Sequence, residues 1–349
     1  MSSALRELLA QLVAFPSVSG RPNSELAGFI AGWLEQRGAA VERVGDPGGG
    51  HVNLHAVMGP AGAAAPLLSS HMDVVDVAGQ HWSGDPFTLR EAGERLVGRG
   101  VADMKGFLAC SLLAAEWAAA AGLPLRLAIT TDEEIGCKGA ALLAPAVAAM
   151  SPLPTRVVVG EPTGMRRATA HKGKLALRVH VRGTAAHSAL APLGQNAVVA
   201  AARLVVGLDE LAAGLAAAAA DSRFSVPHST VSVGPIQGGV ALNIVPDSCS
   251  FEVEMRNVPG DDPQRLRRWL DEASGGRAEV EELAHYPALE GEGGEGLDFG
   301  TEGGIWRQAL GVPVEVCGPG DIADAHRGDE SVPVEQLERC LAQLCAIAG

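Results

Sequence analysis

LRLAITTDEEIG, residues 125–136, is an apolar, strand-like run that ends in two adjacent carboxylates, Glu133 and Glu134. Two like charges this close repel each other, so either one carboxyl is protonated or nearby cations keep both ionised. If Glu134 binds such a cation, Glu133 is left free to take a proton from a water molecule, as a general base must. The stretch therefore predicts a metal site with an unused base at the end of a strand.

Four other segments carry an imidazole or a carboxylate after an apolar run. They are His71 and Asp73 in PLLSSHMDVVD, Asp103 in GRGVADMKG, Glu161 in RVVVGEPT and His326 in CGPGDIADAHRGDE. Loops at the carboxyl ends of strands in an open α/β sheet meet at one place, so we expect these side chains to converge with Glu134. A ligating imidazole needs an acceptor for its other ring nitrogen, and Asp73 is spaced to supply one to His71. The pattern favours a two-metal site.

Each of these residues also has an ordinary structural explanation. A single His after a strand is usually hydrogen-bonded within the fold, and a Glu-Glu pair is usually a solvated turn. Asp103 could cap the helix that follows it. Only the coincidence of all the segments favours the metal site over these alternatives.

The composition is that of a chain able to bury a large core. With 349 residues and 47% hydrophobic content, it is long enough for two domains. The 27 basic and 41 acidic residues give a net charge of −14 without a basic stripe, so nucleic acid is not an expected partner. We find no apolar run of membrane-spanning length and no signal-peptide pattern, and therefore expect no membrane association and a cytoplasmic location. The six cysteines lack Cys-x-x-Cys spacing, which predicts neither disulfides nor a thiolate zinc site.

Two patterns of secondary structure divide the chain. Residues 1–171 alternate helical patterns with apolar strands, including a helix over residues 105–121, which is typical of an α/β fold. Residues 172–279 have the order strand, helix, strand, strand, helix, strand, which predicts a ferredoxin-like α+β unit. Residues 280–349 return to the first pattern and end in a helix over 333–348. We therefore expect a discontinuous domain of residues 1–171 and 280–349, with the α+β domain inserted.

The motifs, taken together, resemble the M20 family of dinuclear metallopeptidases and deacylases over nearly the whole chain. The matching segments occur in the family's order and include SSHMDVVDV, GRGVADMKGF, DEEIGCKGA, GEPT, GTAAHSA, LNIVPD, TEGG and the segment GPG…AH…DE. Within that family the chain is most similar to the acetylornithine deacetylases. The resemblance implies a mixed-sheet, zinc-exopeptidase-like catalytic domain and an inserted lid that also forms the interface of a homodimer.

The resemblance also assigns roles to the predicted site residues. Two divalent ions, Zn²⁺ or Co²⁺, are expected, each with three ligands: His71, Asp103 and Glu161 for the first, and Asp103, Glu134 and His326 for the second. In this assignment Asp103 bridges the ions, Asp73 orients His71, and Glu133 activates the water.

Further candidates lie in the inserted domain and after it. By resemblance, His187 in GTAAHSA reaches across a dimer to stabilise the oxyanion, although its sequence position alone is also that of an exposed lid residue. Arg256 can offer a bidentate fork to a substrate carboxylate, or it can be a solvated strand end. Asn243 in LNIVPD can hydrogen-bond the substrate, and Gly303 and Gly304 leave room for backbone groups to approach an acyl group.

The expected activity is metal-dependent deacylation of an N-acyl amino acid, with N²-acetyl-L-ornithine, a precursor in arginine biosynthesis, as the expected substrate. N-acetylcitrulline, N-succinyl-diaminopimelate or a dipeptide stay open, because these reactions differ only in the acyl group or the amine. A non-catalytic dimeric binding protein on the same scaffold is the alternative from another class, but no ligand or base is lost. Arg327, Gly328 and Ser331 depart from the Gln-Pro and the later aromatic residue of many relatives, which bears on the fit to ornithine.

Overall fold

The computed structural model describes residues 1–45, 50–60, 62–217 and 220–349, and these form two compact units. The first unit comprises Met1–Thr169, Gly291–Gly294 and Thr301–Gly349, and the second comprises Ala170–Glu290 and Glu295–Gly300. The second unit extends beyond residue 279, where the sequence analysis placed its end, because strand β12 continues to Tyr286.

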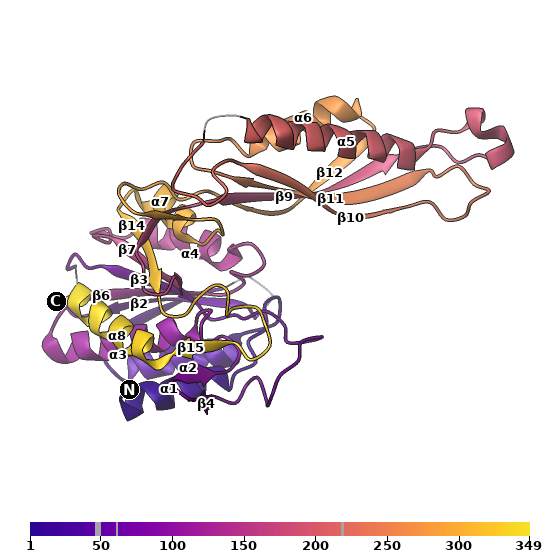
Figure 1. Cartoon of the computed structure of the whole chain (residues 1–349). Coiled ribbons are helices and arrows are strands. Elements are labelled where there is room, and N and C mark those ends of the chain that lie inside the picture. The colour runs from indigo at the N-terminus through magenta and orange to yellow at the C-terminus, as the bar shows by residue number, and fades with distance from the viewer. Residues whose placement is uncertain (46–49, 61, 218–219) are drawn as a thin grey trace. The chain divides into compact units, whose positions relative to one another are not determined.

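A mixed sheet forms the centre of the first unit (Figure 1). Its strands follow one another in the order β1 (Ala40–Gly45), β2 (Val52–Met58), β6 (Leu125–Thr130), β3 (Leu67–His71), β7 (Val157–Pro162) and β14 (Val314–Gly318), and β14 also pairs with β8 (Ala168–His171). Strand β3 is parallel to β6 and β7, and β7 is parallel to β14. These four strands are buried along their whole length, as expected of strands covered on both faces. Their carboxyl ends therefore lie along one edge.

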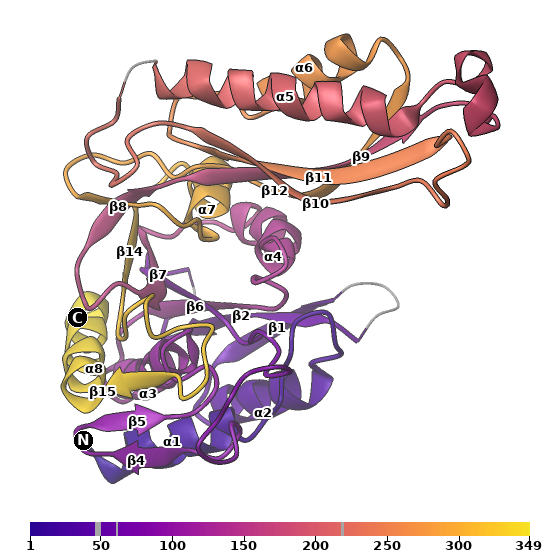
Figure 2. The same ribbon diagram turned by 45° about the vertical axis from the view of Figure 1, so that its right-hand side comes forward.

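Helices cover both faces of this sheet (Figure 2). One face packs against α2 (Ser24–Glu35) and α3 (Lys105–Ala121), with α1 (Ser3–Val13) and α8 (Val334–Ala348) packed on α3, and the other face packs against α4 (Lys138–Ala148) and α7 (Gly303–Leu310). Helix α3 has the predicted bounds and ends at Gly122 in the left-handed conformation, with φ 68°. Helix α3 can approach β7 closely because Gly160 has no side chain, since a Cβ there would lie 1.9 Å from the Phe107 ring.

A small three-stranded sheet lies beside the main one. Its order is β15 (Ser331–Pro333), β5 (Arg95–Val97) and β4 (Arg90–Ala92). Strand β5 leads into the loop that carries Asp103, and β15 directly follows the loop that carries His326. Pairing of β5 with β15 thus brings together two segments that are far apart in the sequence.

The second unit has the predicted order of strands and helices. It consists of β9 (Gly173–Arg182), α5 (Ala197–Ala216), β10 (Thr230–Gly238), β11 (Ser248–Asn257), α6 (Gln264–Ser274) and β12 (Ala278–Tyr286), with the antiparallel order β10-β11-β9-β12. The short elements η1 (Ser188–Leu193) and β13 (Glu295–Leu297) also belong to it. The Ala-rich sequence predicts a first helix over 195–220, and residues 218–219 of that prediction lie outside the described residues.

Alternating burial explains how this sheet is covered. Every second side chain of β9, from Leu175 to Val181, is buried against α5 and α6, and the intervening Ala176, Arg178 and His180 are partly exposed. Such period-two alternation is typical of an antiparallel sheet with one solvated face. In the described part of the chain, every helix is too short or too polar to cross a membrane.

Candidate metal centre

The predicted ligands of the first unit meet at the carboxyl edge of the main sheet. His71 is the last residue of β3, Glu133 and Glu134 follow β6, and Glu161 lies near the end of β7. The parallel register places His71 opposite Thr130, so the segments after β3 and β6 leave the sheet side by side. Asp103 precedes α3, and His326 comes from the loop after β14. The predicted convergence of strand ends therefore occurs within one unit.

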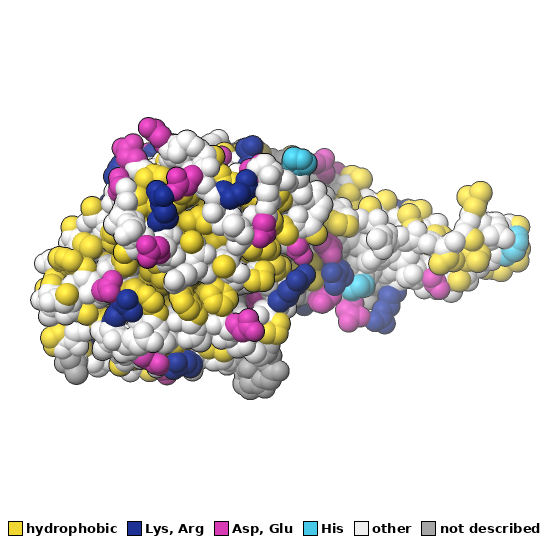
Figure 3. Space-filling view, turned by 90° about the horizontal axis from the view of Figure 1, so that it is seen from below, with side chains coloured by type: hydrophobic (Ala, Val, Ile, Leu, Met, Phe, Trp, Pro, Cys, Tyr) yellow, Lys and Arg dark blue, Asp and Glu magenta, His cyan; other side chains and the backbone are white. Residues whose placement is uncertain are grey.

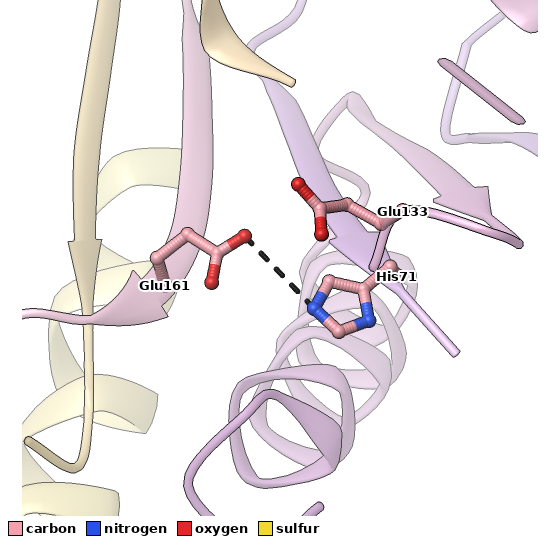
Figure 4. A group of neighbouring side chains, drawn as sticks. All are labelled: His71, Glu133 and Glu161. Carbon is pink, nitrogen blue, oxygen red and sulfur yellow. Dashed lines mark ion pairs between the residues drawn. The ribbon is translucent and has the colours of Figure 1, made fainter. Parts of the chain in front are cut away.

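His71 lies at the centre of the first group of ligand atoms. Its Nε2 is 3.0 Å from Asp103 Oδ1 and 3.9 Å from Glu161 Oε1. Figure 4 shows the carboxylates of Glu133 and Glu161 beside the imidazole, Glu161 from strand β7 and Glu133 from the loop after β6. One ligand atom each from His71, Glu133 and Glu161 lies within 4.8 Å of the others, close enough to hold an ion.

His326 forms the second group with the other oxygen of Asp103. Its Nε2 is 2.9 Å from Glu134 Oε1 and 3.2 Å from Asp103 Oδ2. Asp103 thus offers one carboxylate oxygen to each of the two imidazoles, which is the arrangement of a bridging ligand. Ligand atoms of His71, Asp103 and Glu134 also lie within 4.8 Å of one another.

Asp73 supports the cluster through different atoms than the sequence analysis assumed. The Nδ1 of His71 is 3.0 Å from the backbone oxygen of Asp73 and 3.6 Å from its carboxylate. The carboxylate instead accepts hydrogen bonds from the Ser19 hydroxyl at 2.7 Å and from the backbone amides of Glu133 at 3.1 Å and Glu134 at 3.3 Å. The Asp73 carbonyl lies closer to the ring than the carboxylate does, so Asp73 holds His71 by its backbone and the Glu133 segment by its side chain.

The candidates in the second unit are exposed by comparison. His187 precedes η1 and accepts a hydrogen bond from the Ala189 amide at its Nδ1, at 3.1 Å. Asn243 is exposed and accepts from the Ser188 amide through its backbone oxygen. Arg256, in β11, donates to Glu254 at 3.0 Å and to the Tyr286 hydroxyl at 2.7 Å. Their part in substrate binding therefore stays a prediction.

Gly303 and Gly304 are placed elsewhere, at the start of α7 in the first unit. Both are buried, and the Gly303 amide donates to the Thr301 hydroxyl at 2.9 Å. Their predicted contact with an acyl group is untested by this arrangement.

Comparison with known proteins agrees with this geometry. Residues 67–349 match the family described as "Peptidase family M20/M25/M40". The chain belongs to this family. It is 38% identical to an acetylornithine deacetylase of Myxococcus xanthus over 98% of this chain and 96% of that protein. It is 33% identical to an acetylornithine deacetylase of Proteus mirabilis (strain HI4320), over 95% of this chain and 92% of that protein.

Solved structures of M20 proteins have the same fold. An M20 family metallo-carboxypeptidase from Sulfolobus solfataricus has a TM-score of 0.81 at 18% identity, covering 100% of this chain and 99% of that one. YXEP of Bacillus subtilis, described as a dinuclear metal-binding peptidase of the M20 family, has a TM-score of 0.69 at 15% identity, covering 99% and 96%. At such identities these likenesses establish the fold alone. As an M20 member the chain is a hydrolase.

The pKa values of the buried carboxylates at this site indicate that it suits cations. Burial raises the pKa of Glu133 to about 8, and repulsion from Glu134 adds to it against the opposing effect of His71. Burial likewise raises the pKa of Glu134 to about 7, with repulsion from Asp103, and raises the pKa of Glu161 well above its ordinary value. Divalent cations would compensate the negative charge that these buried carboxylates carry when ionised.

Two further observations support the same fit. Burial opposes ionisation of Asp103, yet hydrogen bonds from His326 and His71 hold its pKa well below the ordinary value. The Oε1 atom of Glu161 is buried and has no hydrogen-bond partner among the described residues. Buried carboxylate oxygens are normally satisfied, so a lone pair left over at this point suits a metal ligand. Imidazole and carboxylate together form a zinc-like donor set.

Sequence reasoning missed two side chains: Cys137, which contacts the cluster, and Glu302, which joins two of the strands that carry it. Cys137 Sγ lies 3.1 Å from Glu133 Oε1. Cys137 itself has a left-handed backbone conformation before α4, with φ 54°, which turns its thiol back toward the carboxylate. Glu302 is fully buried and accepts hydrogen bonds from the Ser69 and Thr130 hydroxyls of two neighbouring strands. The spacing of four between Glu133 and Cys137 was a signal for the first. Glu302 belongs to the motif TEGG, which was interpreted through its two glycines and not through its glutamate.

Proposed function

We propose that this M20 chain is a dinuclear metallohydrolase that deacylates N-acyl amino acids, with N²-acetyl-L-ornithine as substrate and L-ornithine and acetate as products. The observation that carries the proposal is the cluster at the sheet edge. It contains the five proposed ligands, with Asp103 between His71 and His326, and Glu133 as an additional carboxylate. The substrate is supported by the names of the relatives that align over nearly the whole chain.

His71, Asp103 and Glu161 would hold the first ion and Asp103, Glu134 and His326 the second, with Zn²⁺ or Co²⁺ suited to these donors. The two ions would supply Lewis acidity toward the amide carbonyl and toward the attacking water. Glu133 takes a proton from that water as the water oxygen attacks the carbonyl carbon. Glu133 then gives the proton to the amine nitrogen as the C–N bond breaks, because an amide anion is a poor leaving group.

The second unit completes the proposal as a lid and dimerisation domain. His187, which exposes its ring, would donate a hydrogen bond to the oxyanion from the opposite subunit of a homodimer. Arg256 would bind the α-carboxylate of the substrate with the part of its guanidinium that Glu254 and Tyr286 leave free, and Asn243 would assist. Gly303 and Gly304 would accommodate the acyl group.

A product-release assay tests this function. Purified protein with added Zn²⁺ or Co²⁺ should release acetate from N²-acetylornithine with a higher kcat/KM than from N-acetylcitrulline, and more readily than succinate from N-succinyl-diaminopimelate or amino acids from dipeptides. Preference for another of these substrates would move the proposal to a related deacylase or a dipeptidase. Binding of N²-acetylornithine without turnover of any substrate, in protein that carries both ions, would favour a non-catalytic binding protein.

A further inference from the structure

The loops that carry Asp103 and His326 are joined by the small sheet. Ser331 of β15 pairs with Val97 of β5, and the Gly98 amide donates to the Glu330 carbonyl at 3.0 Å. Glu330 directly precedes β15, so this ladder fixes it beside the chain that leads to Asp103. Figure 2 shows β15, the strand that follows this segment, running beside β5.

Both oxygens of the Glu330 carboxylate accept hydrogen bonds from the loop that carries Asp103. Its Oε1 accepts from the backbone amides of Ala102 at 2.9 Å and Asp103 at 3.1 Å. Its Oε2 accepts from the Gly100 amide at 3.0 Å and from Arg99 Nη1 at 2.6 Å. A single buried carboxylate thus fixes the backbone of the bridging ligand itself.

Arg99 extends the same network to His326. Its guanidinium is fully buried, lies 5.0 Å from the centre of the Trp82 ring, and donates through Nη2 to Gln80 Oε1. Gln80 in turn donates through Nε2 to the backbone oxygen of His326 at 3.1 Å. One guanidinium is therefore connected, through one intermediate residue on each side, to both Asp103 and His326.

A buried ion pair of this kind adds little net stability, because desolvation of both charges offsets their attraction. Its connections, however, are directed at Asp103 and His326, two of the three ligands of the second ion in the proposed site. Residues that orient metal ligands in this way commonly change metal affinity by about 10–100-fold when they are removed. We propose that Arg99 and Glu330 are positioning residues that set the spacing of Asp103 and His326 and so determine affinity for the second ion, an inference that rests on the two-ion site of the proposed function.

Metal titration of variants tests this role without relying on activity. Metal-free protein is titrated calorimetrically with Zn²⁺ against a competing chelator, so that the two ions are counted and their affinities measured separately. Glu330→Gln and Arg99→Met should weaken the second ion by about 10–100-fold and the first ion by less. Arg99→Lys, which keeps the charge beside Glu330 but lacks the fork that reaches Gln80, should lie between Arg99→Met and wild type.

Two more variants make the result decisive. Gln80→Leu breaks only the connection to His326 and should weaken the second ion while leaving the first unchanged, even if the buried-pair variants do not fold. Arg126→Met is the matched control, since Arg126 is also a buried arginine of the first unit but lies at the amino end of β6. It should change the melting temperature at most, and neither metal affinity.

Loss of stability with unchanged metal affinities, or equal loss of both ions in Glu330→Gln and Gln80→Leu, would reduce the pair to a structural role and overturn the inference. Wild-type protein that binds two ions but leaves N²-acetylornithine intact would contradict the proposed substrate alone. Wild-type protein that binds fewer than two ions would overturn both.

Discussion

Most candidate functional residues of the first unit are buried, whereas those of the second unit are partly or fully exposed. In the first unit, His71, Asp103 and Glu161 are almost completely buried. His71 and Glu161 are placed by strand ends, and Asp103 by a loop whose backbone amides donate to a buried carboxylate. In the second unit, His187 and Asn243 are exposed on loops. Figure 3 shows hydrophobic side chains gathered at the end of that unit which carries η1 and the turn between β10 and β11. The most exposed of them are Leu193, Val240 and Leu242, with exposures of 74%, 84% and 100%.

This difference indicates what each unit needs for function. The buried cluster is organised by its own backbone and requires only cations to balance its charge. The exposed residues have few internal contacts to fix them, and large apolar side chains left in solvent are typical of a surface that another chain covers. We therefore expect changes in the first unit to abolish chemistry, and changes in the second to weaken oxyanion stabilisation, substrate binding or assembly.

Removal of metal should have the largest effect. Dialysis against a chelator should abolish turnover of N²-acetylornithine, because the buried carboxylates and imidazoles cannot activate water without cations. Added Zn²⁺ or Co²⁺ should restore it. Elemental analysis must accompany the assay, and full activity in protein shown to be free of metal would exclude the dinuclear mechanism.

Glu133→Gln should come next. The amide cannot take the proton of the attacking water, so kcat should fall by at least about 10²–10⁴-fold, the usual contribution of a general base. Steady-state kinetics of acetate release measure the loss. Asp132→Asn is a neighbouring control, because its carboxylate binds the Gly20 amide and His51 rather than the cluster, and it should retain most of the turnover. Equal losses in the two variants would argue against a base at position 133.

The exposed His187 provides a test of the second unit. His187→Ala should lower kcat by about 10²–10³-fold through loss of an oxyanion donor. If the donor acts across a dimer, mixing His187→Ala with Glu133→Gln should restore about 25% of wild-type activity, since about half of the dimers are mixed and each has one intact site. Absence of recovery, with subunit exchange verified by native mass spectrometry, would place His187 in its own subunit's site or outside catalysis.

Arg256 should have the smallest effect of the four and should change binding rather than chemistry. Arg256→Met should raise KM for N²-acetylornithine by about 10-fold or more with a small change in kcat, because a charge-assisted contact to the substrate is lost. Arg178→Met is a matched control on the same face of the sheet, where Arg178 pairs with Glu252 and Glu281. If both variants have the same KM, Arg256 only stabilises the sheet of the second unit.

The sequence predicts the part of this site that depends on strand ends. Apolar runs followed by His71, Glu134 and Glu161 are local patterns, and parallel pairing necessarily brings such ends to one edge. The helix from Lys105 to Ala121 was equally local, because Gly122 ends it.

Local sequence patterns do not predict the contacts that depend on tertiary geometry. Glu330 is separated from Arg99 by 231 positions, and only the pairing of β5 with β15 brings them together. The choice of the Asp73 carbonyl over its carboxylate as partner of His71 depends on the backbone conformation of the segment that follows β3. His326 points at Asp103 from a left-handed position, with φ 59°, that residue type alone does not indicate.

The most direct test of the account is a metal count in two neighbouring variants. Glu133 and Glu134 are chemically alike and adjacent, yet only Glu134 contacts His326, at 2.9 Å. Glu133→Gln should keep two divalent ions per chain by elemental analysis while losing turnover, and Glu134→Gln should lose or weaken one ion. The reverse pattern, with an ion lost in Glu133→Gln and both kept in Glu134→Gln, would contradict the assignment of base and ligand at this sheet edge.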